Sequence, residues 1–169
     1  MPNTYTKIAS VTVGVLGSAT IDFTSIPSTY TDLCLKISAR DNAAAVTNNV
    51  IFKVNGVTTS QSNCYLLGNG ASVSSVSDTP IYFPSNANLS TLSTFSNMEI
   101  YIPNYASTSV NKSLSIDTVT ENNATTAFAS IVAGLYAANT AITSISITGN
   151  GGSSFLQYST ATLYGIKNS

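Results

Sequence analysis

An active site in this chain would have to be built from its seven carboxylate residues, because the sequence contains no histidine. Histidine is the most common general acid and base, so its absence excludes Ser-His-Asp and Cys-His arrangements. A glycosidase needs only two facing carboxylates. However, Asp22 and Glu99 lie on the polar phase of predicted strands. Asp32, Asp41 and Asp78 lie near predicted turns, where Asp is common for local hydrogen-bonding reasons. We therefore predict solvated carboxylates, no catalytic residue and no enzyme.

Two cysteines and a few oxygen-rich segments are the candidates for metal or cofactor chemistry. Cys34 and Cys64 are too far apart in the sequence for a zinc-ligand motif. We expect them to be buried free thiols, with a single disulfide as the alternative. Segments 117–123 and 41–42 lack the regular spacing of a calcium loop. Segment 149–152 is glycine-rich but is not followed by the lysine of a phosphate loop. No metal site and no cofactor are predicted.

Tyrosines raise the separate possibility of a sugar site, because aromatic rings beside amides and carboxylates form many such sites. The chain has nine tyrosines and no tryptophan, and tryptophan is the strongest sugar-stacking side chain. Tyrosine is also a common strand and interface residue. We expect the tyrosines to serve mainly in the core or in interfaces. Those considered are Tyr30, Tyr65, Tyr101, Tyr105 and Tyr158.

The polar surface must be almost uncharged, since charged residues make up only 8% of the 169 residues, against about 25% in a typical soluble domain. Neutral hydroxyls and amides lose less than ions on leaving water, which suits a surface that packs against neighbours. The six Lys and Arg residues are scattered singly and form no basic stripe, so we expect no nucleic acid partner. No stretch reaches the ~18 apolar residues of a membrane span, and the N-terminal segment has no secretion-signal pattern. We expect no membrane partner and no signal peptide.

Alternation of apolar and polar residues predicts β-strands through most of the sequence. The clearest runs are 33–40, 50–54, 98–102, 114–116, 145–147 and 158–166. Asn55-Gly56 favours a tight hairpin turn. Roughly eight to ten strands separated by turn signals predict one antiparallel β-sandwich domain over residues 1–169, jelly-roll-like. A lone up-and-down barrel is the alternative.

Three segments are less clearly patterned. Segment 124–138 is rich in alanine and could be helical, but its β-branched residues and Gly134 favour a strand around 128–136. Segments 68–79 and 85–96 are long and polar. Both are predicted to be exposed loops.

Both ends of the chain carry a pattern that can be compared with known proteins. The quoted stretches are Thr4–Ser10 (TYTKIAS), Ser25–Leu33 (SIPSTYTDL), Ile37–Arg40 (ISAR) and Leu163–Lys167 (LYGIK). They resemble small β-sandwich virion structural proteins of tailed bacteriophages, over about the first quarter of the chain and its last residues. The motifs carry no catalytic residue. The resemblance implies that Tyr5, Ile26, Tyr30 and Tyr164 fix the meeting of the first and last strands.

The function implied by this resemblance is that of a virion structural protein. We expect a capsid decoration (cement) protein on the capsid surface, synthesised in the host cytoplasm, which binds the assembled shell and stabilises it. Its partners would be the major capsid protein and copies of itself, in a homotrimer or another small homo-oligomer. The alternative is a tail fibre or receptor-binding module that contacts host surface glycans.

One inter-subunit element is suggested by position and polarity alone. It is an N-terminal arm made of Met1, Pro2, Asn3, Thr4 and Tyr5. Pairing of edge strands between copies is an equally open route to assembly.

Overall fold

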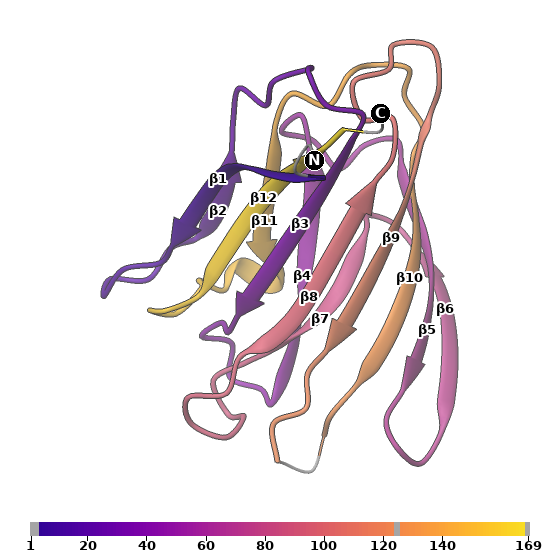
Figure 1. Ribbon diagram of the computed structural model, residues 1–169. Coiled ribbons are helices and arrows are strands. Elements are labelled where there is room, and N and C mark those ends of the chain that lie inside the picture. The colour runs from indigo at the N-terminus through magenta and orange to yellow at the C-terminus, as the bar shows by residue number, and fades with distance from the viewer. Residues whose placement is uncertain (1–3, 124–125, 168–169) are drawn as a thin grey trace.

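The computed structural model describes residues 4–123 and 126–167, and within them the chain folds almost entirely into β-strands (Figure 1). Twelve strands are present in this part, against the eight to ten expected, with one turn of 3-10 helix. They are β1 (Tyr5–Thr12), β2 (Thr20–Phe23), β3 (Asp32–Ala39), β4 (Thr47–Val54), β5 (Gln61–Gly68), β6 (Val73–Asp78), β7 (Tyr82–Asn86), β8 (Ser96–Ile102), β9 (Lys112–Val119), β10 (Ala129–Tyr136), β11 (Ile145–Gly149), η1 (Asn150–Gly152) and β12 (Thr160–Ile166).

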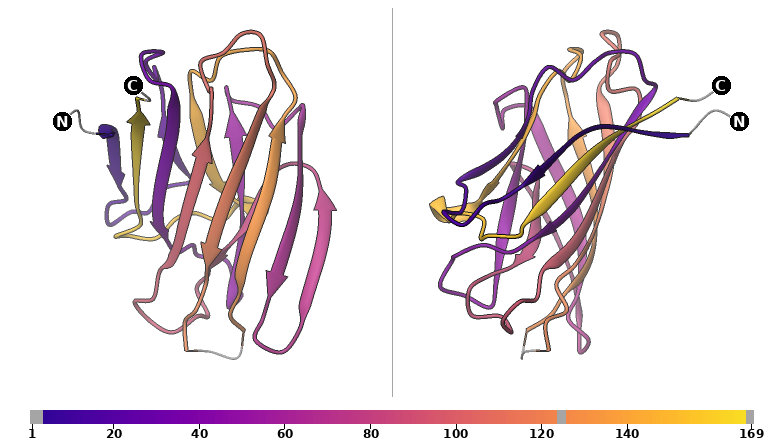
Figure 2. Two further views of the ribbon diagram at one scale, coloured as in Figure 1. Left: turned by 45° about the vertical axis from the view of Figure 1, so that its right-hand side comes forward. Right: turned by 60° about the vertical axis from the view of Figure 1, so that its left-hand side comes forward.

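The strands form two antiparallel sheets that pack face to face, which confirms the predicted β-sandwich (Figure 2). The large sheet has eight strands in the order β1-β12-β3-β8-β9-β10-β5-β6, and the small sheet has four in the order β2-β11-β4-β7. An eight-stranded jelly roll, lettered B to I in chain order, has sheets B-I-D-G and C-H-E-F. The small sheet reproduces the first order. The large sheet reproduces the second, with a β8-β9-β10 meander in place of strand H and the β1-β12 pair added beside β3.

The core lies between the two sheets and follows from the alternation along each strand. In β9 and β10, buried and exposed residues alternate without exception, as a strand with one face on the core requires. The small sheet contributes buried Ile21, Phe52 and Ile147, and the large sheet contributes Ile100 and Leu163. Burial of these apolar side chains is the main force that holds the two layers together.

The turn at Asn55-Gly56 is confirmed, but it does not join two neighbouring strands of one sheet. Both residues have positive φ, at 51° and 78°, as the favoured two-residue turn requires. Val54 and Val57 exchange two backbone hydrogen bonds across it. The next strand, β5, then belongs to the large sheet. Beyond this one bridge, the turn redirects the chain from one layer to the other.

Two of the less clearly patterned segments differ in outcome. Segment 128–136 is a strand, as predicted, since β10 spans Ala129–Tyr136. Segment 68–79 was predicted to be a loop and contains β6 instead. All six β6 residues are exposed, because β6 is the outermost strand of the large sheet and no layer covers it. Without a buried face, the strand leaves no alternation in the sequence.

Two buried cations hold the connecting loops by their backbone carbonyl groups. The alternation places Arg40 on a polar face, yet it is 4% exposed. Its guanidinium donates to the carbonyl oxygens of Asn88, Ser90, Thr91 and Thr94, at 2.6–3.3 Å. Lys112 is equally buried, and its Nζ donates to the carbonyl oxygens of Ser107, Val110, Ala138 and Thr140. Burial lowers the pKa of both cations. Segment 85–96 was predicted to be an exposed loop. It is a loop over residues 87–95, between β7 and β8, but Ala87 and Ser90 are buried, and Arg40 binds four of its carbonyl groups.

The large sheet extends past the small one at the end that carries β5 and β6. The edge strand of the small sheet, β7, packs against β8, β9 and β10. The β5-β6 pair therefore projects beyond β7, at the right of Figure 1. We call this pair the overhang.

Candidate functional site

The carboxylates predicted to be solvated include two that are buried and structural. Asp32 accepts hydrogen bonds from the Tyr101 hydroxyl at 2.7 Å and the Asn104 backbone N–H at 3.0 Å. Asp41 accepts from the Ala43 backbone N–H, from Asn48 and from Ser153, and thereby holds the start of β4 against η1. The prediction was wrong for these two residues. The reason is that apolar–polar alternation and turn-forming residues in the sequence do not show which loop folds back over a carboxylate.

Among the described residues, no group of three or more Cys, Asp or Glu side chains could hold a metal ion. Glu121, considered as a calcium ligand, accepts a hydrogen bond from the Asn123 backbone N–H and closes a local turn. Both cysteines are free thiols. Cys34 is buried as predicted, whereas Cys64 is exposed, which corrects the prediction for the second thiol.

The outer face of the large sheet is divided into a charged half and a neutral half. Across the sheet, Lys36, Glu99, Asp117, Ile131 and Leu66 are successive partners on neighbouring strands. Lys36 and Glu99 form an ion pair at 2.6 Å, with both side chains about half exposed. On β10 and β5 the same row is apolar, and its member on β6 is Ser75, which is uncharged. The division therefore falls between β9 and β10.

Exposed apolar side chains gather on this neutral half and on the adjoining end of β9. This group, which we call the apolar patch, consists of Leu66, Val73, Val119, Ala129 and Ile131. Val73 is 76% exposed and Ile131 is 61% exposed. They border a shallow hollow of about 280 Å³, with Asp117 at its rim. This surface can contact another protein over a region that costs little to desolvate.

The two edges of the large sheet are protected differently. At the β1 edge, the register shifts between Lys7 and Ala9, so a bulge and a lysine interrupt the edge. Such features hinder pairing with another chain. The β6 edge is continuous in register from Val73 to Asp78 and has no charge before Asp78. It is therefore open to strand addition, next to the apolar patch.

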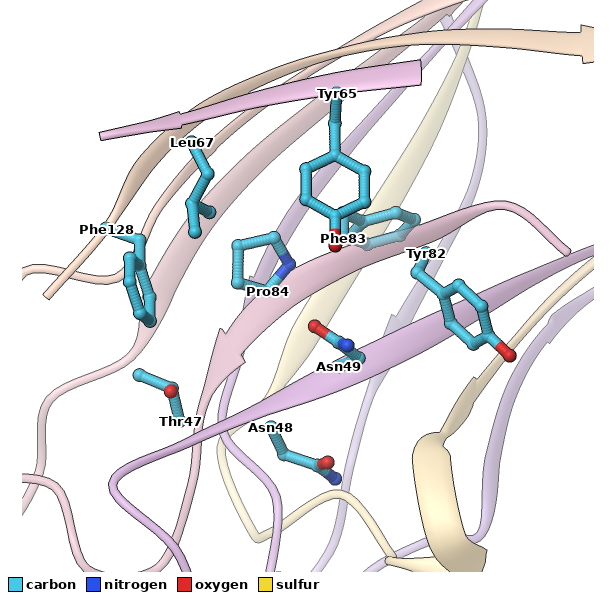
Figure 3. Close-up of a pocket in the computed structure, with 9 residues that line it drawn as sticks. All are labelled: Thr47, Asn48, Asn49, Tyr65, Leu67, Tyr82, Phe83, Pro84 and Phe128. Atoms are coloured by element: carbon cyan, nitrogen blue, oxygen red, sulfur yellow. The ribbon is translucent and has the colours of Figure 1, made fainter. Parts of the chain in front are cut away.

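A groove lies between the overhang and the edge of the small sheet (Figure 3). Its volume is about 300 Å³. Tyr65 and Leu67 reach into it from β5, and Phe128 closes one end. The opposite wall is formed by side chains of β4 and β7. These are Thr47, Asn48, Asn49, Tyr82, Phe83 and Pro84.

The first and last strands meet as predicted, since β1 pairs with β12 along its length. The rings of Tyr5 and Tyr164 pack edge to face, with centroids 6.0 Å apart. The Tyr30 ring fills the space over Gly165, where a Cβ atom would lie 2.3 Å from it. Ile26 is buried in the core.

The predicted N-terminal arm is described only in part. Met1, Pro2 and Asn3 lie outside the described residues. Thr4 is exposed, and Tyr5 is already the first residue of β1. An arm that reaches a neighbouring subunit therefore stays a prediction, for residues that precede Tyr5.

Comparison with known proteins identifies no relative of this chain. No family model, no curated protein and no solved structure matches the chain. In the described part, no helix is long and apolar enough to cross a membrane. The molecule is thus defined by its own fold, as an antiparallel jelly-roll-like β-sandwich with a groove and an apolar patch.

Sequence reasoning singled out one groove residue, Tyr65, and none of the apolar patch. The patch residues occupy outward positions in their strands, where a sequence offers no sign that several strands bring them together. Only the pairing of β9, β10, β5 and β6 assembles them. Apolar residues on the outward phase of several strands, such as Ile131 and Val119, were the one available signal.

Proposed function

We propose that the chain is a structural protein of a bacteriophage particle, a capsid decoration protein that binds the outer surface of the assembled shell. The observation that carries the proposal is the apolar patch. Contiguous apolar patches on the surface of a soluble protein often serve an interaction. The resemblance of the chain ends to phage virion proteins supports the choice of the major capsid protein as the partner.

The mechanism of stabilisation is mass action. A protein that binds the assembled shell and not its free subunits shifts the equilibrium toward assembly. Many copies on a symmetric lattice then multiply a modest contact. The open β6 edge beside the patch supplies backbone donors and acceptors for pairing with a second copy or with a shell strand.

The copy number of the chain in purified particles tests this proposal. Quantitative mass spectrometry against the major shell protein is expected to give a fixed, simple ratio between the two. A count that matches the few copies of a tail component would contradict decoration.

Binding of purified chain to shells that lack it tests the surface. Ile131→Lys is expected to abolish co-sedimentation with the shells, because it places a charge in the centre of the patch. Leu16→Lys is the matched control, since Leu16 is 98% exposed in the turn between β1 and β2. Equal binding of both variants would remove the patch from the interface.

A second candidate function is a tail fibre or receptor-binding module that contacts host glycans. The groove favours it, because its lining combines aromatic rings with amides. A low copy number together with glycan binding would favour this candidate over decoration.

A further inference from the structure

The groove beneath the overhang has a lining without charge. None of the nine residues that line it is Asp, Glu, Lys or Arg. The lining residue Asn48 donates a hydrogen bond to the carboxylate of Asp41, but Asp41 is fully buried. A phosphate, a carboxylate or an ammonium group would find no opposite charge to offset its loss of hydration. The groove therefore fits a neutral ligand.

Several polar groups in the groove are available for such a ligand. Within residues 4–123 and 126–167, the Tyr65 and Tyr82 hydroxyls and the Asn49 side-chain amide have no hydrogen-bond partner. Asn48, by contrast, already donates to Asp41, Asn150 and Ser153. Ligand pockets characteristically join an apolar lining to a few such donors and acceptors. Asn49 offers both a donor and an acceptor at one point.

Aromatic and apolar side chains make up most of the rest of the lining, on both walls of the groove. The Tyr65 ring points from β5 toward β7, and Phe128 stands beside Leu67 at one end (Figure 3). The face of an aromatic ring carries partial negative charge and attracts weakly positive C–H groups. The lining therefore suits a ligand that presents both C–H groups and hydroxyl groups.

We propose that this groove is a binding site for a neutral saccharide. The Tyr65 ring and Phe128 pack against the C–H face of a sugar ring, and Asn49 bonds its hydroxyl groups from β4. The volume of about 300 Å³ lies at the lower end of the range for ligand pockets. The site therefore takes a small saccharide or one end of a longer glycan. The inference is independent of whether the chain sits on the capsid or on the tail.

A glycan array that carries both neutral and sialylated or sulfated glycans is the first test. Binding confined to neutral glycans is expected, and the strongest hit is then titrated by calorimetry. Tyr65→Ala is expected to weaken binding about tenfold or more through loss of the stacked ring. Asn49→Ala is expected to weaken it by a smaller factor, because Asn49 is exposed and water replaces part of its hydrogen bonding.

Tyr158→Ala is the matched control, because Tyr158 is 68% exposed and lies outside the groove. It is expected to leave saccharide binding unchanged, and thermal melts verify that each variant is folded. The proposal is overturned if no neutral glycan binds, if anionic glycans bind as well, or if folded Tyr65→Ala retains full affinity. Capture of an extended peptide in the groove, with no saccharide binding, would also overturn it. None of these results affects the copy number, so failure here is distinct from failure of the decoration proposal.

Discussion

Two thiols on one row of the large sheet have opposite environments. Cys34, Tyr101, Ser115, Ala133 and Cys64 are successive cross-strand partners and therefore share the outer face. Cys34 is fully buried, whereas Cys64 is exposed. The sheet covers neither thiol from this side. The difference must come from the side chains beside each of them.

The neighbours of the two cysteines account for the contrast. Cys34 lies between Tyr101 of β8 and Tyr164 of β12, and we attribute its burial to their long side chains. Cys64 lies between Ala133 and Ser77, which are too short to cover it. On the charged half of the outer face, tyrosines and an ion pair flank the strands. On the neutral half, which includes the overhang, short side chains leave Cys64 exposed. The position of a residue in its strand thus determines which face of the sheet its side chain lies on, and the side chains on adjacent strands determine how exposed it is.

The largest effect that tests this comparison is in thiol reactivity. A disulfide reagent added to the native protein is expected to modify Cys64 at once. Cys34 is expected to react slower by at least about 10³-fold, because it is reached only through unfolding. Burial also raises the Cys34 pKa to about 11, so little thiolate is present. Stopped-flow absorbance measures both rates.

Single-cysteine variants identify the two phases. Cys64→Ser should remove the fast phase, and Cys34→Ser should remove the slow one. Simultaneous modification of both thiols in the native protein would show that the neighbouring tyrosines do not shield Cys34 from the reagent.

A smaller effect, on the free energy of unfolding, distinguishes the inner face of the large sheet from the neutral half of its outer face. Ile100→Ala is expected to lower the free energy of unfolding by about 2–5 kcal/mol, since Ile100 is fully buried and truncation leaves a cavity. Ile131→Ala is expected to change it by no more than about 0.5 kcal/mol, because Ile131 is 61% exposed. Urea unfolding measures both changes. A large loss in the second variant would mean that the apolar patch serves folding rather than binding.

The smallest expected effect concerns the charged half and is pH-dependent. The hydrogen bond that Tyr101 donates to Asp32 raises the pKa of Tyr101 to about 12. The folded-state pKa exceeds the unfolded value of about 10, so the protonated phenol stabilises the fold. This stability is fully present below about pH 10 and is lost as pH rises from about 10 to 12.

Tyr101→Phe removes the bond and is expected to cost about 1 kcal/mol at neutral pH. Urea unfolding of both proteins between pH 8 and pH 12 provides the measurement. The wild type and the variant should converge in stability above about pH 10. Tyr158→Phe, which removes an exposed phenol, is the matched control. A constant gap across this range would show that the Asp32 bond does not govern the titration.

The sequence predicted most of the fold and little of the candidate sites. Strands such as β8, β9 and β10 bury one face, so their alternation is visible in the residues. β6 buries neither face and was missed. Arg40 was assigned to a polar face, because nothing in its neighbourhood shows that a loop 50 residues later wraps its guanidinium.

The sequence by itself determined the class of fold, the turn at Asn55-Gly56 and a surface of neutral polar residues. These follow from local periodicity, backbone preference and composition, which need no knowledge of distant contacts. Only the tertiary structure decided that β5 and β6 project beyond β7, and with this overhang it created both the groove and the apolar patch. The physical reason is that sheet order depends on pairings between segments far apart in the chain, such as β5 with β10. No local pattern records these pairings.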